Sequence, residues 1–266
     1  MKPITAPDLR RMKERGEPIV AVTAYDYSTA VALDQAGVDL LLVGDSLAQV
    51  VLGHPTTLPV TMEEMLHHVR AVSRGARRAL VVADLPFLSY NTPAEAVANG
   101  GRFLKEAGAA AVKLEGGNPA QLQATRALVE QGIPVVAHLG FTPQSVHAFG
   151  GYRLQGKSPE RALEIREQAL ELEKAGASAL VLELVPPELA AAIRTELAIP
   201  TIGIGAGPDC DGQVQVFHDL VGLYTDHVPK HAARYARVHE TIGEAVGRYA
   251  DDVRAGRFLR VPSTAT

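Results

Sequence analysis

One arrangement recurs along the 266-residue chain: a helical pattern, a glycine after it, and a short apolar run that ends in a polar residue. Glycine commonly follows the end of a helix, because it adopts the left-handed conformation without strain. The apolar runs are rich in Val, Leu and Ile without clean alternation, which is typical of parallel strands covered on both faces. We expect such strands after Pro18, Gly37, Ala79, Gly108, Gly132, Gly176 and Pro200, and a less regular eighth around residues 220–225.

The segments between these runs carry helix-start signals. A Ser, Thr or Asn followed three residues later by Glu or Gln is typical of a capping box, which satisfies free backbone N–H groups in the first turn. Proline in the first turn strengthens the signal. We expect helices that begin at Thr61 with Glu64, Thr92 with Glu95, Asn118 with Gln121, and Ser158.

Strands that alternate with helices leave two architectures, an open doubly wound sheet and a closed barrel. An open sheet binds its ligand at one switch point, whereas a barrel brings every strand end to one mouth. We therefore predict an α/β fold, a single-domain (β/α)8 TIM barrel over residues 1–266, with an extra helix at residues 5–16 that closes its bottom. The choice rests on polar residues at the ends of most runs: Asp26, Asp45, Asp84, Glu115, His138 and Glu183.

Charge and cysteine content exclude several classes of protein. The net charge of −4 provides no basic surface for nucleic acid or for an anionic membrane. Cys210 is the only cysteine, so neither an internal disulfide nor a cysteine-based zinc site can form. We find no apolar segment of signal-peptide or membrane-spanning length. We expect a cytoplasmic protein.

Three of the strand-end residues are the carboxylates Asp45, Asp84 and Glu115. Burying such groups is costly unless their charge is neutralised. Oxygen ligands without cysteine favour Mg²⁺, which binds one or two carboxylates directly and keeps several waters. We expect two direct ligands and a third that acts partly through water. The alternative is that each acid caps the helix after its strand.

Two further residues point to proton and charge chemistry. Glu183 lies in the apolar run LVLELV, and its desolvation would raise its pKa and suit it to remove a proton from carbon. Lys113 shares a strand face with Glu115, which favours a charged lysine that binds a carboxylate or enolate. The alternatives are a salt-bridged Glu183 and a Schiff-base Lys113, as in metal-independent aldolases. His138 fits either packing or catalysis.

Two connections after strands are too long for simple turns: Ser46 to Val60 and Gly140 to Lys157. Long ordered loops of this kind are usually lids or binding loops. Because both follow strands that end in candidate site residues, we expect them to overhang the mouth of the barrel. The alternative is a pair of insertions without a role.

Nine collinear motifs, from about Lys2 to beyond Lys230, together resemble the ketopantoate hydroxymethyltransferase family. The resemblance implies a Mg²⁺-dependent barrel enzyme that makes ketopantoate for pantothenate and coenzyme A biosynthesis. The motifs are TAYDYS (23–28), LVGDSLAQVVLGHPTTLPVT (42–61), VADLPF (82–87), VKLEGG (112–117), HLGFTPQSV (138–146), FGGYRLQGK (149–157), VLELVP (181–186), IGIGAG (202–207) and CDGQVQVFHD (210–219).

The resemblance also implies roles and partners. The enzyme would transfer a hydroxymethyl group from methylenetetrahydrofolate to α-ketoisovalerate (3-methyl-2-oxobutanoate) through a metal-stabilised enolate, as a homo-oligomer, a decamer. Glu183 would be the proton acceptor. Asp45, Asp84 and Glu115 would hold one Mg²⁺ per subunit, and Asp45, Ser46, Asp84 and Lys113 would contact the substrate.

Three alternatives stay open at this point. The first is a Mg²⁺-dependent lyase or mutase of the phosphoenolpyruvate mutase and isocitrate lyase type. Such an enzyme also uses Mg²⁺ with an enolate, but it cleaves or rearranges its substrate. A Schiff-base aldolase would use Lys113 without a metal. The third is a non-catalytic barrel that merely binds keto acids.

Overall fold

The computed structural model describes residues 2–226, 229 and 232–258 of the chain. It divides into two compact units, Met1–Val216 and Phe217–Thr266. The closed sheet lies within the first unit. The expectation of one domain over residues 1–266 stays a prediction.

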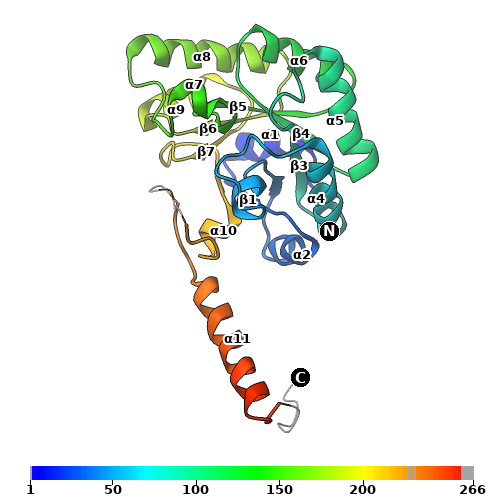
Figure 1. Ribbon diagram of the computed structural model, residues 1–266. Helices are drawn as coiled ribbons and strands as arrows, with labels where there is room; N and C mark the ends of the chain where they lie inside the picture. The colour runs from blue at the N-terminus through cyan, green and yellow to red at the C-terminus, as the bar shows by residue number, and fades with distance from the viewer. Residues whose placement is uncertain (1, 227–228, 230–231, 259–266) are drawn as a thin grey trace. The chain divides into compact units, whose positions relative to one another are not determined.

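The first unit contains a closed barrel of eight parallel strands in sequence order, with β8 hydrogen-bonded back to β1. Helices alternate with the strands and surround them (Figure 1). The predicted (β/α)8 fold is therefore confirmed. The strands are β1 (Ile19–Thr23), β2 (Leu40–Val43), β3 (Leu80–Asp84), β4 (Ala111–Glu115), β5 (Val135–Gly140), β6 (Ala179–Glu183), β7 (Thr201–Ile204) and β8 (Gly212–Gln215).

Four helices of this unit, α4, α5, α6 and α8, begin where the sequence signals predict. Thr61 and Thr92 form reciprocal capping boxes with Glu64 and Glu95. Asn118 and Ser158 each accept a backbone N–H in the first turn, without the reciprocal bond. The helices are α1 (Ala6–Arg15), α2 (Tyr27–Gln35), α3 (Leu47–Val50), α4 (Met62–Gly75), α5 (Pro93–Ala107), α6 (Pro119–Glu130), η1 (Pro143–Ser145), α7 (Val146–Phe149), α8 (Pro159–Lys174) and α9 (Pro187–Glu196).

The eighth strand is not where the sequence pattern placed it. Residues 212–215 form β8, whereas Leu220 ends the short helix α10 (Phe217–Leu220) in the second unit. The strand was missed because it reads Gly-Gln-Val-Gln, with Gln213 exposed, and so lacks an apolar run. Gly212 pairs with Ile19 of β1, and a side chain at this glycine would collide with the Ile19 carbonyl oxygen. Gly212 therefore allows the backbone of β8 to approach the backbone of β1 closely.

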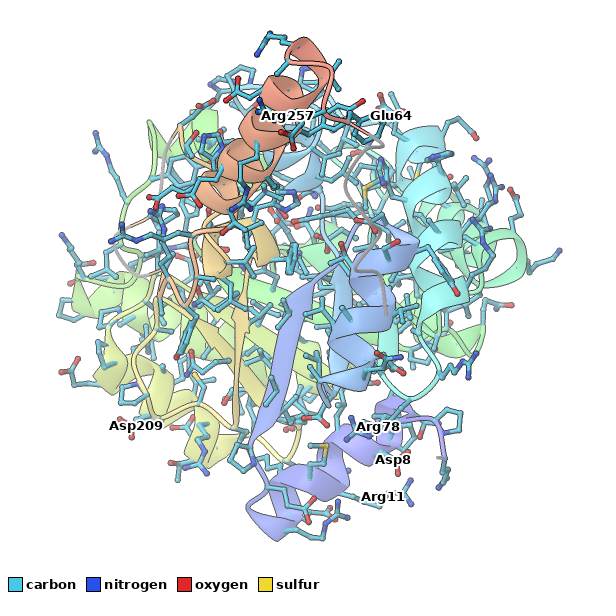
Figure 2. The ribbon with its side chains drawn as sticks, turned by 90° about the horizontal axis from the view of Figure 1, so that it is seen from below. Asp8, Arg11, Glu64, Arg78, Asp209 and Arg257 are labelled. Atoms are coloured by element: carbon cyan, nitrogen blue, oxygen red, sulfur yellow. The ribbon has the colours of Figure 1, made fainter. Side chains whose placement is uncertain are left out.

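The barrel interior is filled by every second residue of the strands, including Leu40, Leu80, Val136 and Val181. The predicted N-terminal helix forms α1, and its Leu9 and Met12 side chains belong to the same buried cluster. The labelled residues of α1, Asp8 and Arg11, lie at the same end of the barrel as Arg78 and opposite Glu64 (Figure 2). Because Arg78 precedes β3 and Glu64 lies in the first turn of α4, helix α1 closes the amino end of the barrel.

The second unit contains α10 and a longer helix, α11 (Val238–Arg254). None of the described residues of α11 is buried. Within the described part of the chain, no helix is both long and apolar enough to cross a membrane.

Candidate active site

At the carboxyl end of the barrel, the interior positions change from apolar to ionisable. On β3 the inward series Leu80 and Val82 continues with Asp84, and on β4 Ala111 is followed by Lys113 and Glu115. Strand register then places Lys113 beside Asp84 and His138 beside Glu115. The site is therefore the continuation of the barrel core, with side chains of opposite charge at its last positions.

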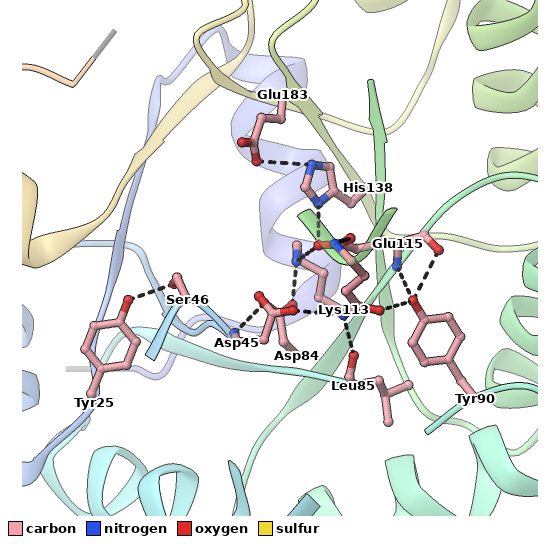
Figure 3. Close-up of polar contacts among 11 residues, drawn as sticks. Tyr25, Asp45, Ser46, Asp84, Leu85, Tyr90, Lys113, Glu115, His138 and Glu183 are labelled. Atoms are coloured by element: carbon pink, nitrogen blue, oxygen red, sulfur yellow. Dashed lines mark hydrogen bonds and ion pairs between the residues drawn. The ribbon is translucent and has the colours of Figure 1, made fainter. Parts of the chain in front are cut away.

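Asp84 joins two neighbouring strands through its two carboxylate oxygens. The Lys113 ammonium donates to Oδ1 at 2.6 Å, and the backbone N–H of Asp45, just past β2, donates to Oδ2 at 3.1 Å (Figure 3). Asp45, Asp84 and Lys113 are all buried. The predicted acids from β2 and β3 thus meet with Lys113 at one point.

His138 connects the two remaining acids. Its Nδ1 lies 3.5 Å from Oε1 of Glu115 and its Nε2 lies 3.5 Å from Oε2 of Glu183 (Figure 3). The Glu183 side chain is 13% exposed, against 3% for Glu115, so Glu183 reaches closest to solvent. Glu183 is therefore the acid of this pair that an entering substrate would meet.

Ser46 follows Asp45 and lies 2.8 Å from the Tyr25 hydroxyl through its Oγ. Tyr25 lies just past β1, so this contact joins the first two strand ends. Asp26 has a different position: it is exposed and caps α2 by accepting the Thr29 N–H. Asp26, although it follows a strand as the other acids do, is therefore a helix cap and not part of the cluster.

Gln144 and Tyr90 are part of the site and were missed by the sequence reasoning. Gln144 donates its amide N–H to Oδ2 of Asp45 at 2.9 Å and its backbone N–H to Oε2 of Glu115 at 2.9 Å. The Tyr90 hydroxyl donates to Oε1 of Gln144 at 2.6 Å. Tyr90 lies in a loop and Gln144 in the single turn η1, and neither segment is long enough for periodicity to mark an inward side chain. The only signal was their place in or beside the motifs VADLPF and HLGFTPQSV.

Burial and charge act against each other in this cluster. Burial would lower the pKa of Lys113, but the carboxylates of Asp84, Glu115 and Asp45 raise it overall, so Lys113 is an ammonium. Burial raises the pKa of Asp45 well above its usual range, with the charges of Glu115 and Asp84 adding to the effect. Burial likewise raises the pKa of Glu115 to about 7, against the opposing effect of Lys113. The Lys113 ammonium therefore does not fully compensate the negative charge of Asp45 and Glu115.

The pKa values of His138 and Glu183 also follow from burial. Burial lowers the pKa of His138 well below its usual value, and the Lys113 ammonium adds to the effect, so the imidazole is neutral. Burial raises the pKa of Glu183 well above its usual value, and the negative charge of Glu115 adds to the effect. A carboxylate of this kind is a stronger base than one in water.

The donor chemistry of the cluster fits a hard divalent cation. Three carboxylates against one ammonium leave two negative charges uncompensated in a buried place. Oε1 of Glu115 is buried and accepts no hydrogen bond from the described residues. No three His, Cys, Asp or Glu side chains of the described chain are already spaced as a complete ligand set. Asp45, Asp84 and Glu115 would therefore need small side-chain adjustments, with waters completing the coordination.

The two long loops lie together at this end of the barrel. Gln49 of the first donates its amide N–H to the Tyr152 hydroxyl of the second at 3.3 Å. Tyr152 in turn packs on Phe141, with ring centroids 4.8 Å apart. The backbone N–H of Phe141 donates to the Glu183 carbonyl oxygen at 2.8 Å. The second loop is therefore ordered and tied to the strand end that carries Glu183.

Comparison with known proteins gives a family match along nearly the whole chain. A family model described as ketopantoate hydroxymethyltransferase matches residues 3–260. A 3-methyl-2-oxobutanoate hydroxymethyltransferase from Gloeobacter violaceus is 59% identical over 248 residues, which cover 93% of this chain and 95% of the relative. One of that name from Chloroflexus aggregans is 57% identical over 254 residues, 96% and 90% of the two chains.

Among solved structures, the phosphoenolpyruvate phosphomutase from Streptomyces platensis subsp. rosaceus is similar, with a TM-score of 0.66. The match covers 99% of this chain and 92% of that one, at 16% sequence identity. Identity this low shows a shared fold. The two hydroxymethyltransferases, in contrast, are identical to this chain at more than half of the aligned residues.

Proposed function

The chain belongs to the ketopantoate hydroxymethyltransferase family, and on this premise we propose that it transfers a hydroxymethyl group from methylenetetrahydrofolate to 3-methyl-2-oxobutanoate, giving ketopantoate. One observation carries the proposal: Asp84, Lys113 and Glu115 on neighbouring strands meet at the barrel mouth. His138 lies between Glu115 and Glu183. This arrangement combines buried acids, a fixed positive charge and a desolvated base.

One Mg²⁺ would be held by Asp45, Asp84 and Glu115, whose uncompensated charge and oxygen donors suit it. When bound, the ion would act as a Lewis acid toward the keto oxygen and stabilise the enolate. Substrate contacts are assigned to Asp45, Ser46, Asp84 and Lys113. The Lys113 ammonium, held by Asp84 at 2.6 Å, offsets negative charge as it grows on the substrate.

Glu183 performs the proton transfer. The C3–H bond of the keto acid breaks, the proton goes to a Glu183 oxygen, and the electron pair moves into the keto group. The resulting carbon nucleophile forms a C–C bond to the methylene carbon, whose two C–N bonds to the folate break, and water supplies the hydroxyl oxygen. Tetrahydrofolate leaves, its two nitrogens having taken up the C3 proton, returned from Glu183, and one proton of the water. The neutral His138 imidazole lies beside the Glu183 carboxylate, with Nε2 3.5 Å from Oε2. The raised pKa of Lys113 argues against a Schiff base, which needs the free amine.

The co-substrate, the assembly and the compartment belong to the same proposal. The folate would enter beneath the two long loops, which the Gln49–Tyr152 hydrogen bond joins. We propose a homo-oligomer, a decamer, in the cytoplasm, where a single cysteine suits a reducing environment. Sedimentation of the purified protein would measure the oligomeric state directly.

The test is a pair of assays on the purified enzyme with Mg²⁺ and 3-methyl-2-oxobutanoate. Deuterium from solvent should enter C3 without folate, and ketopantoate should form once methylenetetrahydrofolate is added. Chelation of the metal should stop both. Cleavage or rearrangement of a phosphonate or hydroxy-diacid substrate, without condensation, would instead favour the lyase and mutase alternative and overturn the proposal.

A further inference from the structure

Gln144 binds two acids of the site at once, one through its side chain and one through its backbone. Its Nε2 donates to Oδ2 of Asp45 at 2.9 Å and to the carbonyl oxygen of Leu85 at 3.0 Å. Its backbone N–H donates to Oε2 of Glu115 at 2.9 Å. Gln144 is only 6% exposed, so water competes little for these bonds. One residue therefore joins the ends of β2, β3 and β4.

The orientation of the Gln144 amide follows from its neighbours. The Leu85 carbonyl can only accept, so the NH₂ group must face it and Oε1 must point away. On that side the Tyr90 hydroxyl donates to Oε1 at 2.6 Å. Tyr90 also accepts the Glu115 backbone N–H at 3.4 Å and is 7% exposed. The amide is therefore held at both ends in a single orientation.

These bonds occupy one carboxylate oxygen of Asp45 and one of Glu115. Oδ2 of Asp45 and Oε2 of Glu115 are occupied by Gln144, whereas Oε1 of Glu115 has no hydrogen-bond partner among the described residues. Groups that bind one oxygen of a metal-binding carboxylate orient the other, and their loss typically weakens metal binding. Gln144 has this relation to both Asp45 and Glu115.

Gln144 also belongs to the second long loop. It lies in η1, and the loop continues through α7 to Phe149 and Tyr152, both of which pack on Phe141. Gln144 is thus a direct connection between Asp45, Glu115 and this loop. A cation that increases order in the loop would, by thermodynamic linkage, bind more tightly to the ordered loop by the same factor.

We propose that Gln144 is a positioning residue that holds Asp45 and Glu115 for a divalent cation and couples occupancy of the cation site to the order of residues 141–157. The inference rests on the proposed function, because that function makes Asp45 and Glu115 metal ligands. Tyr90 supports Gln144 by fixing the far end of its amide.

The test uses the full chain with Mg²⁺ alone. Calorimetric titration measures Mg²⁺ affinity, and hydrogen exchange with mass spectrometry measures protection of residues 141–157 with and without the ion. Gln144→Leu removes the side-chain bonds, and Tyr90→Phe removes one hydroxyl as a gentler variant. Gln155→Leu, in the same loop, is the matched control, because the Gln155 side chain donates to Arg153 O and has no hydrogen bond to an acid among the described residues.

We expect Gln144→Leu to weaken Mg²⁺ binding by about 10- to 100-fold. The Mg²⁺-dependent protection of residues 141–157 should disappear in this variant, be reduced in Tyr90→Phe and persist in Gln155→Leu. If Gln144→Leu does not fold, as thermal unfolding would show, Tyr90→Phe decides the question. Three results would each overturn the inference. The first is a Mg²⁺ affinity equal to that of the wild type in every folded variant. The others are a wild type whose loop protection does not change with Mg²⁺ and a wild type that binds no Mg²⁺.

The result is separable from the fate of the proposed function. Mg²⁺ binding coupled to the loop through Gln144, in a wild-type protein that condenses no keto acid with the folate, would remove the proposed reaction and leave the coupling intact. Condensation activity with unchanged Mg²⁺ affinity in Gln144→Leu would do the reverse.

Discussion

Nε2 of His138 lies 3.5 Å from Oε2 of Glu183, the assigned proton acceptor, while Nδ1 of the same ring faces Glu115. A neutral imidazole has one N–H donor, so it can donate to only one of the two carboxylates. Protonation of the other carboxylate would let it donate to the remaining ring nitrogen. His138 therefore links the base to a candidate metal ligand.

Replacement of His138 by leucine should slow deuterium exchange at C3 of the keto acid by about 10- to 100-fold, because Glu183 loses the group that orients it. The KM for the keto acid should change much less, since His138 is not assigned to substrate binding. A rate of exchange equal to that of the wild type would show that the histidine only packs.

Glu183→Gln should abolish C3 exchange, because the amide cannot accept the proton. Mg²⁺ affinity, measured by calorimetry, should stay close to that of the wild type, since Glu183 is not among the proposed ligands. Glu188→Gln, on the exposed surface of α9, is the matched control. Exchange that survives in Glu183→Gln would assign the base elsewhere.

Lys113→Met should lower the free energy of unfolding by about 3–5 kcal/mol at pH 8, because it leaves buried carboxylates without their positive partner. Protonation of the stranded acids relieves this charge, so the deficit should shrink toward pH 5. Denaturant titrations at both pH values test the prediction, with the exposed Lys105→Met as the control. If borohydride traps the substrate on Lys113 despite chelation of metals, the aldolase alternative is correct.

Asp211 should make stability depend on acid pH. Burial would raise its pKa, but hydrogen bonds from Thr201, Arg194 and Lys13 lower it overall. Because the folded pKa lies below the unfolded value of about 3.9, the contribution is fully present above that value and is lost as pH falls through the folded pKa.

Asp211→Asn should therefore cost about 1.5–3 kcal/mol at pH 7, and its difference from the wild type should narrow below about pH 4. Asp209→Asn, two residues away and exposed, should behave as the wild type. Parallel acid unfolding curves for Asp211→Asn and the wild type would contradict the assignment.

Two glycines should respond in opposite ways to alanine. Gly140 has φ of +93°, and a Cβ there would collide with the Glu183 carbonyl oxygen, so Gly140→Ala should cost more than about 2 kcal/mol. Gly101 lies in α5 with open space around it, so Gly101→Ala should add up to about 1 kcal/mol. Thermal unfolding of both variants provides the measurement. Equal shifts in the two midpoints would show that backbone conformation is not the cause.

The fold was largely predictable from the chain because its signals are local. Thr61 and Thr92 cap helices wherever such spacings occur, and the apolar runs form strands because both of their faces become covered. The eighth strand escaped this reasoning. Residues 212–215 form a strand because they pair with β1 and β7. The residue types of this segment do not predict a strand.

The candidate site divides in the same way. Asp45, Asp84, Lys113, Glu115 and Glu183 could be selected because strand ends in a barrel must meet. Their roles as ligands, contacts and base stay predictions.

The amino-acid sequence by itself determined the barrel, its bottom-closing helix and the acids around its mouth, since periodicity and caps act over a few residues. Only the tertiary structure decided that Asp26 caps a helix, that His138 lies between two glutamates, and that Gln144 and Tyr90 bind the acids. These relationships depend on strand register and on the paths of the loops. Local sequence periodicity, which extends over a few residues, does not predict them.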